Sequence, residues 1–302
     1  KPKVDYLSLV LSTIGFGTLI YGFSSAGESE AGFTSPSVYS FIIVGLIALT
    51  LFCIRQFKLE EPVMNLRVFK YPMYTHAVFM FVIIIMAMFA SEIILPIYMQ
   101  GALGVAAATA GLVLLPGSIL NGLMSPVMGS LFDKLGPKPL MIPATIVLSG
   151  TVFTLSRLTL ETPLYVLIIC YLLLMLSISA ILMPAETNGL NQLPKDLYPH
   201  GTAVMTTLQP VTGAIGVSVF VSIMNARQYH YLEGAANPSD PATIQLSMVA
   251  GVNLVYTISF IITIIAVILA FIVYRAKPIN QTEESRSRIV AMSFCVPRSW
   301  EL

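Results

Sequence analysis

Two carboxylates stand inside strongly apolar stretches of this sequence. Glu92 lies in the stretch MAMFASEIILPIYMQ, and Glu186 lies in LMPAETNGLNQLP. A charge placed in hydrocarbon costs roughly 2.5 kcal/mol or more, so an acid in such a stretch usually faces an internal cavity and serves a function. There it can carry a proton or select a cationic ligand. A plainer role is open to both acids, which could instead reach a membrane surface or cap a helix.

Four uncharged polar residues extend this set. Asn188 lies in the same stretch as Glu186, Asn121 and Gln209 lie inside other apolar stretches, and Tyr98 follows closely after Glu92. An amide in a membrane helix hydrogen-bonds either a neighbouring helix or a bound molecule, and bonds between helices are the commoner use. A tyrosine at the end of an apolar stretch is also typical of an anchor at the membrane surface. We treat all four, together with the two acids, as candidates for a substrate and proton path.

A short stretch, GSLFDKLGPKPL, begins at Gly129 and joins two apolar stretches. We expect Gly129 to let two helices approach closely and Gly136 to permit a tight turn. Asp133 could face a helix N-terminus or a basic partner, and Lys134 and Lys138 add positive charge beside it. Such a loop could act as a charge latch that holds one conformation of a moving bundle. The alternative is an ordinary tight loop with lysines at the membrane face.

Other kinds of chemistry find no support in the sequence. His76, His200 and His230 are isolated, so no metal site is predicted. No phosphate-binding GxxxxGK[ST] pattern occurs, which leaves ATP-driven transport unsupported. No Ser-His-Asp set stands at a plausible spacing. We therefore expect no catalytic residues and no cofactor, and a protein that is not an enzyme.

The elements that must position these residues are membrane-spanning helices. Of the 302 residues, 56% are hydrophobic and only 10% are charged, whereas soluble domains carry about 25% charged residues. So few charges could not cover a water-soluble core of this size. Apolar runs of about 18 residues or more predict spanning helices, since backbone groups in lipid must bond within their own segment. We predict eight such helices, at residues 6–23, 38–54, 73–99, 105–131, 140–156, 164–189, 202–224 and 248–274.

The positions of the Lys and Arg residues predict how these helices are oriented in the membrane. If the N-terminus is placed in the cytoplasm, fourteen of the 16 Lys and Arg residues fall in inner segments. Arg157 and Arg227 are the two that fall in outer loops. Cytoplasmic loops carry the excess of Lys and Arg, so we expect a multi-pass protein of the cell (plasma) membrane with both termini cytoplasmic. The longest outer loop is expected at residues 225–246.

The spacing of the helices suggests an uneven, all-α organisation. Residues 1–54 hold two helices, and residues 55–71 form a basic connector that we expect to lie on the cytoplasmic membrane face. Residues 72–275 hold six further helices, and three plus three helices is the inverted-repeat unit of many transporters. Residues 276–302 are polar, and we expect a disordered cytoplasmic tail there. In the connector, we expect the lipid side to be formed by Val63, Leu66, Val68 and Phe69.

The loop that begins at Gly129 resembles the loop motif of the major facilitator superfamily. Three further stretches, LPIYMQ, GLVLLPGSILNGLMSPVMG and LNQLPKDLYPHGTAVMTTLQPVTGAIGVSV, resemble the fourteen-helix drug:proton antiporters of the EmrB/QacA type, and among them the lincomycin-resistance and related multidrug exporters. The resemblance covers nearly the whole chain up to Tyr274. Pro137 departs from the basic residue usual at that point of the motif, which could weaken the latch. The matching positions are Gly129, Leu131, Asp133, Lys134, Gly136, Lys138 and Leu140.

This resemblance implies what the chain does and what it lacks. The first two helices fit the family's linker helices, and the other six fit its C-terminal six-helix bundle. The resemblance implies proton-coupled efflux of amphipathic drug-like molecules, with an N-terminal six-helix half as partner, the lipid bilayer as surroundings and no nucleic acid. The family's antiporter motif and embedded proton-coupling acids belong to that other half, so they cannot be carried over to this chain.

Two other readings stay open. The chain could be a truncated, transport-inactive membrane fragment or a membrane interaction partner, since it begins with Lys1 and carries an unusual tail from Ser293. A membrane-embedded enzyme is the third reading, although it lacks a metal or nucleophile constellation. Efflux that is sensitive to an uncoupler would separate the first reading from the second.

Overall fold

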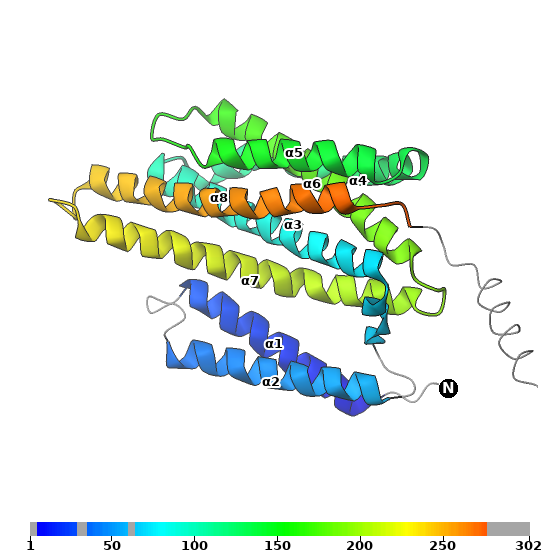
Figure 1. Ribbon diagram of the computed structural model, residues 1–302. Helices are drawn as coiled ribbons and strands as arrows, with labels where there is room; N and C mark the ends of the chain where they lie inside the picture. The colour runs from blue at the N-terminus through cyan, green and yellow to red at the C-terminus, as the bar shows by residue number, and fades with distance from the viewer. Residues whose placement is uncertain (1–4, 29–34, 60–63, 277–302) are drawn as a thin grey trace, which may run out of the picture.

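The computed structural model describes residues 5–28, 35–59 and 64–276, and its secondary structure in those ranges is entirely helical (Figure 1). Eight helices are long and apolar enough to cross a membrane, so the predicted number of spanning helices is confirmed. They are α1 (Tyr6–Glu28), α2 (Pro36–Lys58), α3 (Pro72–Ile97), α4 (Ala107–Leu135), α5 (Lys138–Leu155), α6 (Leu164–Asn191), α7 (Tyr198–Glu233) and α8 (Pro241–Ile272), with a short 3-10 helix η2 (Leu66–Lys70) and a π-helical turn η3 (Tyr98–Ala102) between them.

Local sequence signals fix where several helices begin. Proline occupies the first turn of α2, α3 and α8, where its missing N–H would have no partner in the helix anyway. The α8 helix is also capped, because the carboxylate of Asp240 accepts a hydrogen bond from the backbone N–H of Thr243 at 3.3 Å. In η2, the side chain of Asn65 accepts from the N–H of Arg67 in the same way. These caps satisfy donors that a helix start leaves unpaired.

The helices form one bundle with the α1–α2 hairpin at its edge (Figure 1). The central helices are α3 and α6, which contact each other, while α4 packs mainly on α6. The α5 helix lies between α6 and α8, and α7 contacts α3, α8 and α1. The hairpin therefore reaches the other six helices through the contact of α1 with α7. Among the eight described spans, α4 is the least buried, so much of its surface has no neighbour among the described residues.

Two apolar clusters hold the six-helix part together. The larger cluster joins α3, α5, α6 and α8 and includes Ile84, Leu148, Ile178 and Val252, all of which are fully buried. The smaller cluster lies where η2 and the start of α3 meet the end of α6 and the beginning of α7, and Tyr74 is at its centre. Because lipid is as apolar as these side chains, close packing between helices must supply much of their stabilisation.

Glycine residues let α1 and α2 pack closely against each other in the hairpin. A Cβ atom placed on Gly45 of α2 would lie 3.0 Å from the carbonyl oxygen of Gly15 and 3.0 Å from Leu19 on α1. Small residues at such crossings let two backbones approach closely. The hairpin is tied to α7 by the hydroxyl of Ser218, which donates a hydrogen bond to the carbonyl of Phe23 on α1.

The α7 helix is longer than the apolar pattern predicted. It runs over Tyr198–Glu233, and α8 begins at Pro241, so the expected outer loop at residues 225–246 shrinks to 234–240. The prediction of a long loop was wrong because hydropathy marks where an apolar surface ends, and a helix can continue beyond that point. The stretch NARQYHYLE contains no Gly or Pro, which are the residues that break helices, and Gly234 follows directly after it.

The connector also differs from its prediction. Val68 is fully buried in the smaller apolar cluster, so its predicted place on the lipid side is wrong. Phe69 is exposed and its ring lies against Tyr74 with the centroids 5.8 Å apart. Val63 lies outside the described residues, as does the predicted tail apart from Ala276.

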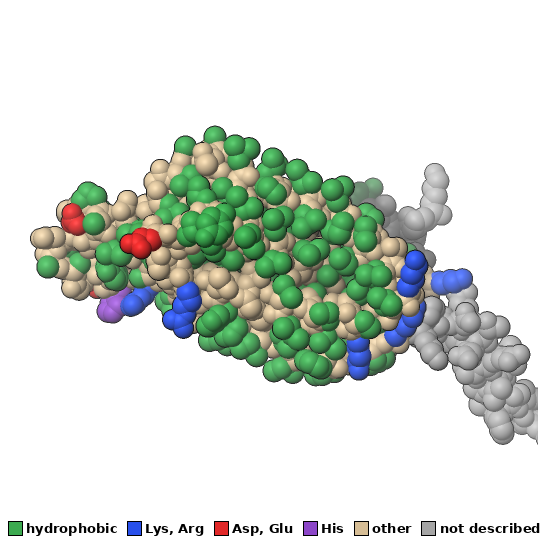
Figure 2. Space-filling view, turned by 90° about the horizontal axis from the view of Figure 1, so that it is seen from above, with side chains coloured by type: hydrophobic (Ala, Val, Ile, Leu, Met, Phe, Trp, Pro, Cys, Tyr) green, Lys and Arg blue, Asp and Glu red, His purple; other side chains and the backbone are tan. Residues whose placement is uncertain are grey.

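Apolar and basic side chains occupy different parts of the surface along the length of the bundle. Figure 2 shows apolar side chains over the middle of the molecule and a group of Lys and Arg side chains at the end where the described chain finishes. We call this the basic end and the other the opposite end. Of the ten Lys and Arg residues that the structure describes, Arg157 and Arg227 lie at the opposite end and the other eight at the basic end, because each spanning helix reverses the direction of the chain.

Candidate functional site

The loop between α4 and α5 is a tight turn at the basic end. Gly136 ends α4 with a φ of +82°, a conformation that glycine adopts without the penalty of a Cβ atom. Its N–H donates to the carbonyl of Phe132 at 2.8 Å. The α8 end reaches this turn, since Nη2 of Arg275 donates to the backbone carbonyl of Asp133 at 2.8 Å. The loop is thereby joined to the C-terminal end of the bundle.

The charged side chains of this loop lie on the surface of the described chain. Asp133, Lys134 and Lys138 are all exposed. Within residues 5–28, 35–59 and 64–276, the Asp133 carboxylate has no hydrogen bond or ion pair, because Arg275 contacts only its backbone carbonyl. The carboxylate is thus available to a partner outside this part of the chain.

Gly129 differs from the expectation for this loop. A Cβ atom at this position would meet only the tip of Met183, at 3.9 Å, so the expected close approach of two helices is not made by the described residues. The close approach on α4 lies three turns earlier, at Gly117. A Cβ atom there would come within 2.4 Å of the Tyr171 ring on α6.

The two candidate acids lie on the two central helices. Glu92 of α3 is half-buried and lies within electrostatic range of Tyr171 on α6. Glu186 of α6 is half-buried and lies within range of Tyr74 on α3. Fifteen residues separate Tyr171 from Glu186 along α6, which corresponds to about 22 Å of helix. The two acids therefore occupy different depths and do not form a pair.

Three of the uncharged candidates bond to backbone groups. Asn121 of α4 donates to the carbonyl of Met175 on α6 at 3.0 Å, which is a bond between helices. Asn188 is fully buried, donates to the carbonyl of Tyr274 at 2.9 Å, and accepts from the N–H of Ala276 at 2.9 Å. Tyr98 is fully buried too, and its hydroxyl donates to a carbonyl of the α5–α6 turn. These bonds make Asn188 and Tyr98 packing residues rather than lining residues.

Gln209 has the opposite surroundings. It is exposed on α7, and among the described residues its amide makes no hydrogen bond. The structure therefore leaves Glu92, Glu186 and Gln209 as polar side chains with unused bonding capacity. It does not bring all six path candidates into one cluster.

Two amide side chains outside the six path candidates hold helix ends, and only Gln192 of the two had no predicted role. Gln192 accepts from the N–H groups of Met73 and Tyr74, at 2.6 and 3.3 Å, and so caps the start of α3 from the end of α6. Asn253 of α8 accepts from the N–H of Leu158 at 3.1 Å and donates to its carbonyl at 2.9 Å. Their positions near the ends of apolar stretches gave no sign of which backbone groups they would meet.

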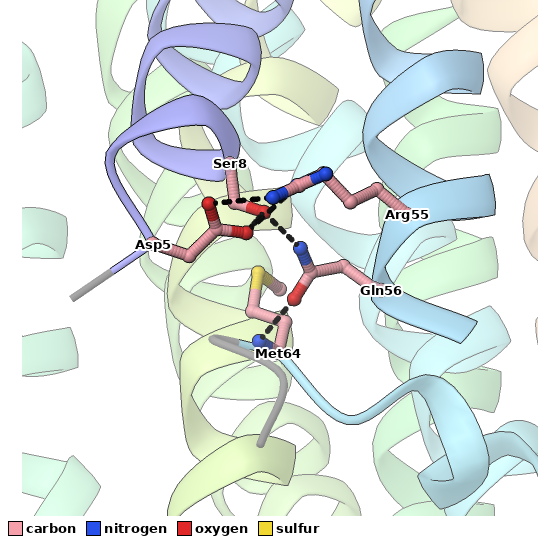
Figure 3. A network of polar contacts seen from close by, with 5 residues as sticks. All are labelled: Asp5, Ser8, Arg55, Gln56 and Met64. Carbon is pink, nitrogen blue, oxygen red and sulfur yellow. Dashed lines mark hydrogen bonds and ion pairs between the residues drawn. The ribbon is translucent and has the colours of Figure 1, made fainter. Parts of the chain in front are cut away.

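A polar network anchors the hairpin at the basic end (Figure 3). Arg55 of α2 forms an ion pair with Asp5, with Nε 2.8 Å from Oδ2. Gln56 donates to the hydroxyl of Ser8 at 2.8 Å and accepts from the N–H of Met64 at 3.1 Å. The Arg55 guanidinium and the Ser8 hydroxyl hold the pKa of the Asp5 carboxyl well below its usual range. The network thus joins α1, α2 and the connector at one point.

No group of three or more His, Cys, Asp and Glu side chains that could hold a metal ion occurs among the described residues. The arrangement is a helical bundle with an open face on α4, half-buried acids in its centre and a charged turn at one end. Such a bundle can bind and move a solute.

Comparison with known proteins decides the family. The family model described as Major Facilitator Superfamily matches residues 5–217, which is more than half of the chain. The chain belongs to the major facilitator superfamily. This family consists of transporters and not of enzymes, as the sequence predicted.

Curated relatives in this superfamily include drug-resistance proteins. The chain is 50% identical over 277 residues to the lincomycin resistance protein LmrB of Bacillus subtilis (strain 168), covering 92% of this chain and 58% of that relative. It is 47% identical to the LmrB of Listeria monocytogenes over the same shares of both chains. The multidrug transporter protein MdtP of Bacillus subtilis is more distant, at 25% identity over 76% of this chain and 42% of its own length. The chain spans less than two thirds of the length of these superfamily relatives.

Proposed function

We propose that this chain is the later part of a secondary active transporter that exports amphipathic drug-like molecules in exchange for protons. The observation that carries the proposal is the 50% identity to the lincomycin resistance protein LmrB over 92% of the chain. In this proposal α1 and α2 are linker helices, the connector follows, and α3 to α8 form the C-terminal six-helix half.

The missing partner in this proposal is an N-terminal six-helix half. The poorly buried surface of α4 supports it, because Leu112, Ile119 and Leu123 are exposed there beside the polar Ser118. A second half packed near this surface would enclose a cavity with the exposed face of α7 around Gln209. Rocking of the two halves about a central site would then give alternating access to the two sides of the membrane.

Two groups are proposed to act during this movement. Glu92, half-buried on a central helix, would line the path and favour cationic or amphipathic molecules. Asp133, whose carboxylate has no partner among the described residues, would contact the other half and stabilise one conformation of the bundle. Glu186 is a second candidate for the proton path.

The basic end is proposed to face the cytoplasm of a cell whose plasma membrane holds the protein. Eight of the ten described Lys and Arg residues lie at that end, and cytoplasmic loops carry such an excess. Both termini would then be cytoplasmic, since Asp5 and Ala276 lie at the basic end.

The first experiment is the mass of the native product in its own membrane, read with an antibody against residues 225–240. A product well above the 32.8 kDa of this chain would support a complete fourteen-helix exporter. A product of 32.8 kDa would favour the transport-inactive fragment or interaction partner, unless a separate N-terminal half accompanies it.

The second experiment is efflux from cells that lack their own exporters. Cells that express the native product should export lincomycin, and an uncoupler should abolish that export. Cells expressing a product in which Glu92 and Glu186 are both replaced by glutamine provide the matched control. Export that continues in the presence of the uncoupler would contradict proton coupling.

A further inference from the structure

The two basic residues at the opposite end come together in one pocket. Arg157 lies in the turn after α5, and Arg227 lies near the end of α7, seventy residues later. Both line a pocket of about 560 Å³, together with Ser156, Asn253 and Thr257. The pocket is formed by the α5–α6 turn, α7 and α8, so its walls come from three separate segments.

The turn that carries Arg157 is hydrogen-bonded to α8. Asn253 of α8 bonds both the N–H and the carbonyl of Leu158, at 3.1 and 2.9 Å. These two bonds join the backbone next to Arg157 to α8. The guanidinium of Arg157 lies over the ring of Phe153, with its carbon 5.4 Å from the ring centroid.

The pocket carries positive charge that the described part of the chain does not neutralise. Neither Arg157 nor Arg227 forms an ion pair within residues 5–28, 35–59 and 64–276. Both side chains are exposed. The acids that are close in sequence, Glu161 and Glu233, do not line the pocket. Two guanidinium groups in one pocket are suited to a phosphate group, which arginine binds through paired hydrogen bonds.

An apolar surface continues from the pocket toward the middle of the bundle. Phe153 of α5 and Phe260 of α8 contact each other there, with ring centroids 5.2 Å apart. Further along α8, Ile261, Ile264 and Ile268 are exposed. A ligand that fits both parts has a phosphate at one end and long aliphatic chains at the other.

We propose that this pocket binds the phosphate of an anionic phospholipid, whose acyl chains lie along Phe153, Phe260 and the exposed isoleucines of α8. The lipid belongs to the leaflet at the opposite end, which is the outer leaflet in the orientation proposed above. The proposal rests on the chain spanning a membrane, and it does not depend on the identity of a transported drug.

Native mass spectrometry of the purified full chain tests the proposal. Phosphatidylglycerol and phosphatidylcholine with identical acyl chains are titrated separately, and inorganic phosphate is added as a competitor. We expect phosphatidylglycerol to bind about tenfold more tightly than phosphatidylcholine, because both lipids offer a phosphate to the two arginines but only phosphatidylcholine places a cationic choline beside them. Inorganic phosphate should compete weakly, since it lacks the acyl chains.

The matched variants separate this pocket from general charge effects. In the Arg157→Gln and Arg227→Gln double variant, the preference for phosphatidylglycerol should fall about tenfold. The Lys134→Gln and Lys138→Gln double variant removes the same charge at the basic end and should keep the preference. If the arginine double variant fails to fold, the single Arg227→Gln variant and the comparison of the two lipids on the unmodified chain still decide the question.

Three results would overturn the proposal. Equal affinity for the two lipids would show that the pocket does not select a headgroup with a net negative charge. Equal loss in both double variants would show a general charge effect. Displacement by millimolar inorganic phosphate would show that a free anion is the ligand. None of these results bears on drug export, which the efflux experiment tests separately.

Discussion

At the scale of single residues, buried amide side chains fix the places where helices end. Asn188 is the most enclosed of them, and it holds both the carbonyl of Tyr274 and the N–H of Ala276. These backbone groups follow α8, where the chain has left the helix and needs other partners. Asn188 is therefore a structural residue in the described chain, although its place in an apolar stretch made it a candidate for the substrate path.

Replacing Asn188 by Ala should lower the free energy of unfolding by about 1–3 kcal/mol, because two backbone groups would lose their partner in a buried place. Thermal unfolding of the purified chain in detergent measures this change. Gln209→Ala is the control, since this exposed amide makes no hydrogen bond among the described residues and should change stability by about 0.5 kcal/mol or less. Equal loss in the two variants would contradict the role assigned to Asn188.

Glu92 is a second single residue whose proposed role can be tested, and this role is in transport. Glu92→Gln keeps the shape of the side chain and removes its charge, so export of a cationic drug should fall about tenfold at equal expression. Uptake and efflux of a fluorescent cationic dye by intact cells measure the effect. Glu233→Gln, at the exposed end of α7, serves as the control. Normal efflux by the Glu92→Gln variant would remove this residue from the proposed path.

At the scale of elements, the contact of α4 with α6 depends on one glycine. A Cβ atom on Gly117 would lie 2.4 Å from the Tyr171 ring and 3.2 Å from the Tyr171 carbonyl oxygen. Gly117→Ala should therefore cost about 1–3 kcal/mol, as overpacking does in other well-packed cores. Gly122→Ala on the same helix should be tolerated, because no described atom lies within 4 Å of its added Cβ. Thermal unfolding of both variants measures the two changes in stability. An equal loss of stability in Gly117→Ala and Gly122→Ala would contradict the role assigned to Gly117.

The hairpin offers a test that depends on pH. The folded pKa of Asp5 is lowered chiefly by the Arg55 guanidinium, so the contact stabilises the folded chain at pH values above the ordinary carboxyl pKa of 3.8. As the pH falls below that value and through the lower folded pKa, the contribution is lost. Asp5→Asn should thus be less stable than the unmodified chain at pH 7, and the difference should shrink at pH 3. Unfolding curves at both pH values measure it, and a difference that does not depend on pH would contradict the ion pair.

At the scale of the whole molecule, the charged turn between α4 and α5 is proposed to control movement of the two halves. In the complete exporter, Asp133→Asn should slow turnover about tenfold while drug affinity changes less than about twofold. Transport rate and drug binding are measured on the same membranes. Asp196→Asn, another exposed acid at the basic end, is the control. Equal losses of rate and affinity in the Asp133 variant would indicate misfolding instead.

The sequence could predict the number of helices because each apolar run is long enough to cross a membrane by itself. It could not predict which side of a helix meets protein and which meets lipid, since both surroundings are apolar. Val68 was misjudged for this reason, since it is fully buried. The loop motif identified the tight turn at Gly136, whereas the contact from Arg275 joins residues 142 positions apart and had no local signal.

The length of α7 has a practical consequence for imaging. Its 36 residues correspond to a rod of about 54 Å, while a bilayer with its headgroups is about 40–45 Å thick. A helix of this length that crosses along the bilayer normal extends beyond the headgroups by about two turns. Small membrane proteins are hard to align in electron micrographs because detergent hides their features. A nanobody that binds the exposed turns of α7 would add a rigid feature outside the micelle, and this feature would help to align the particles.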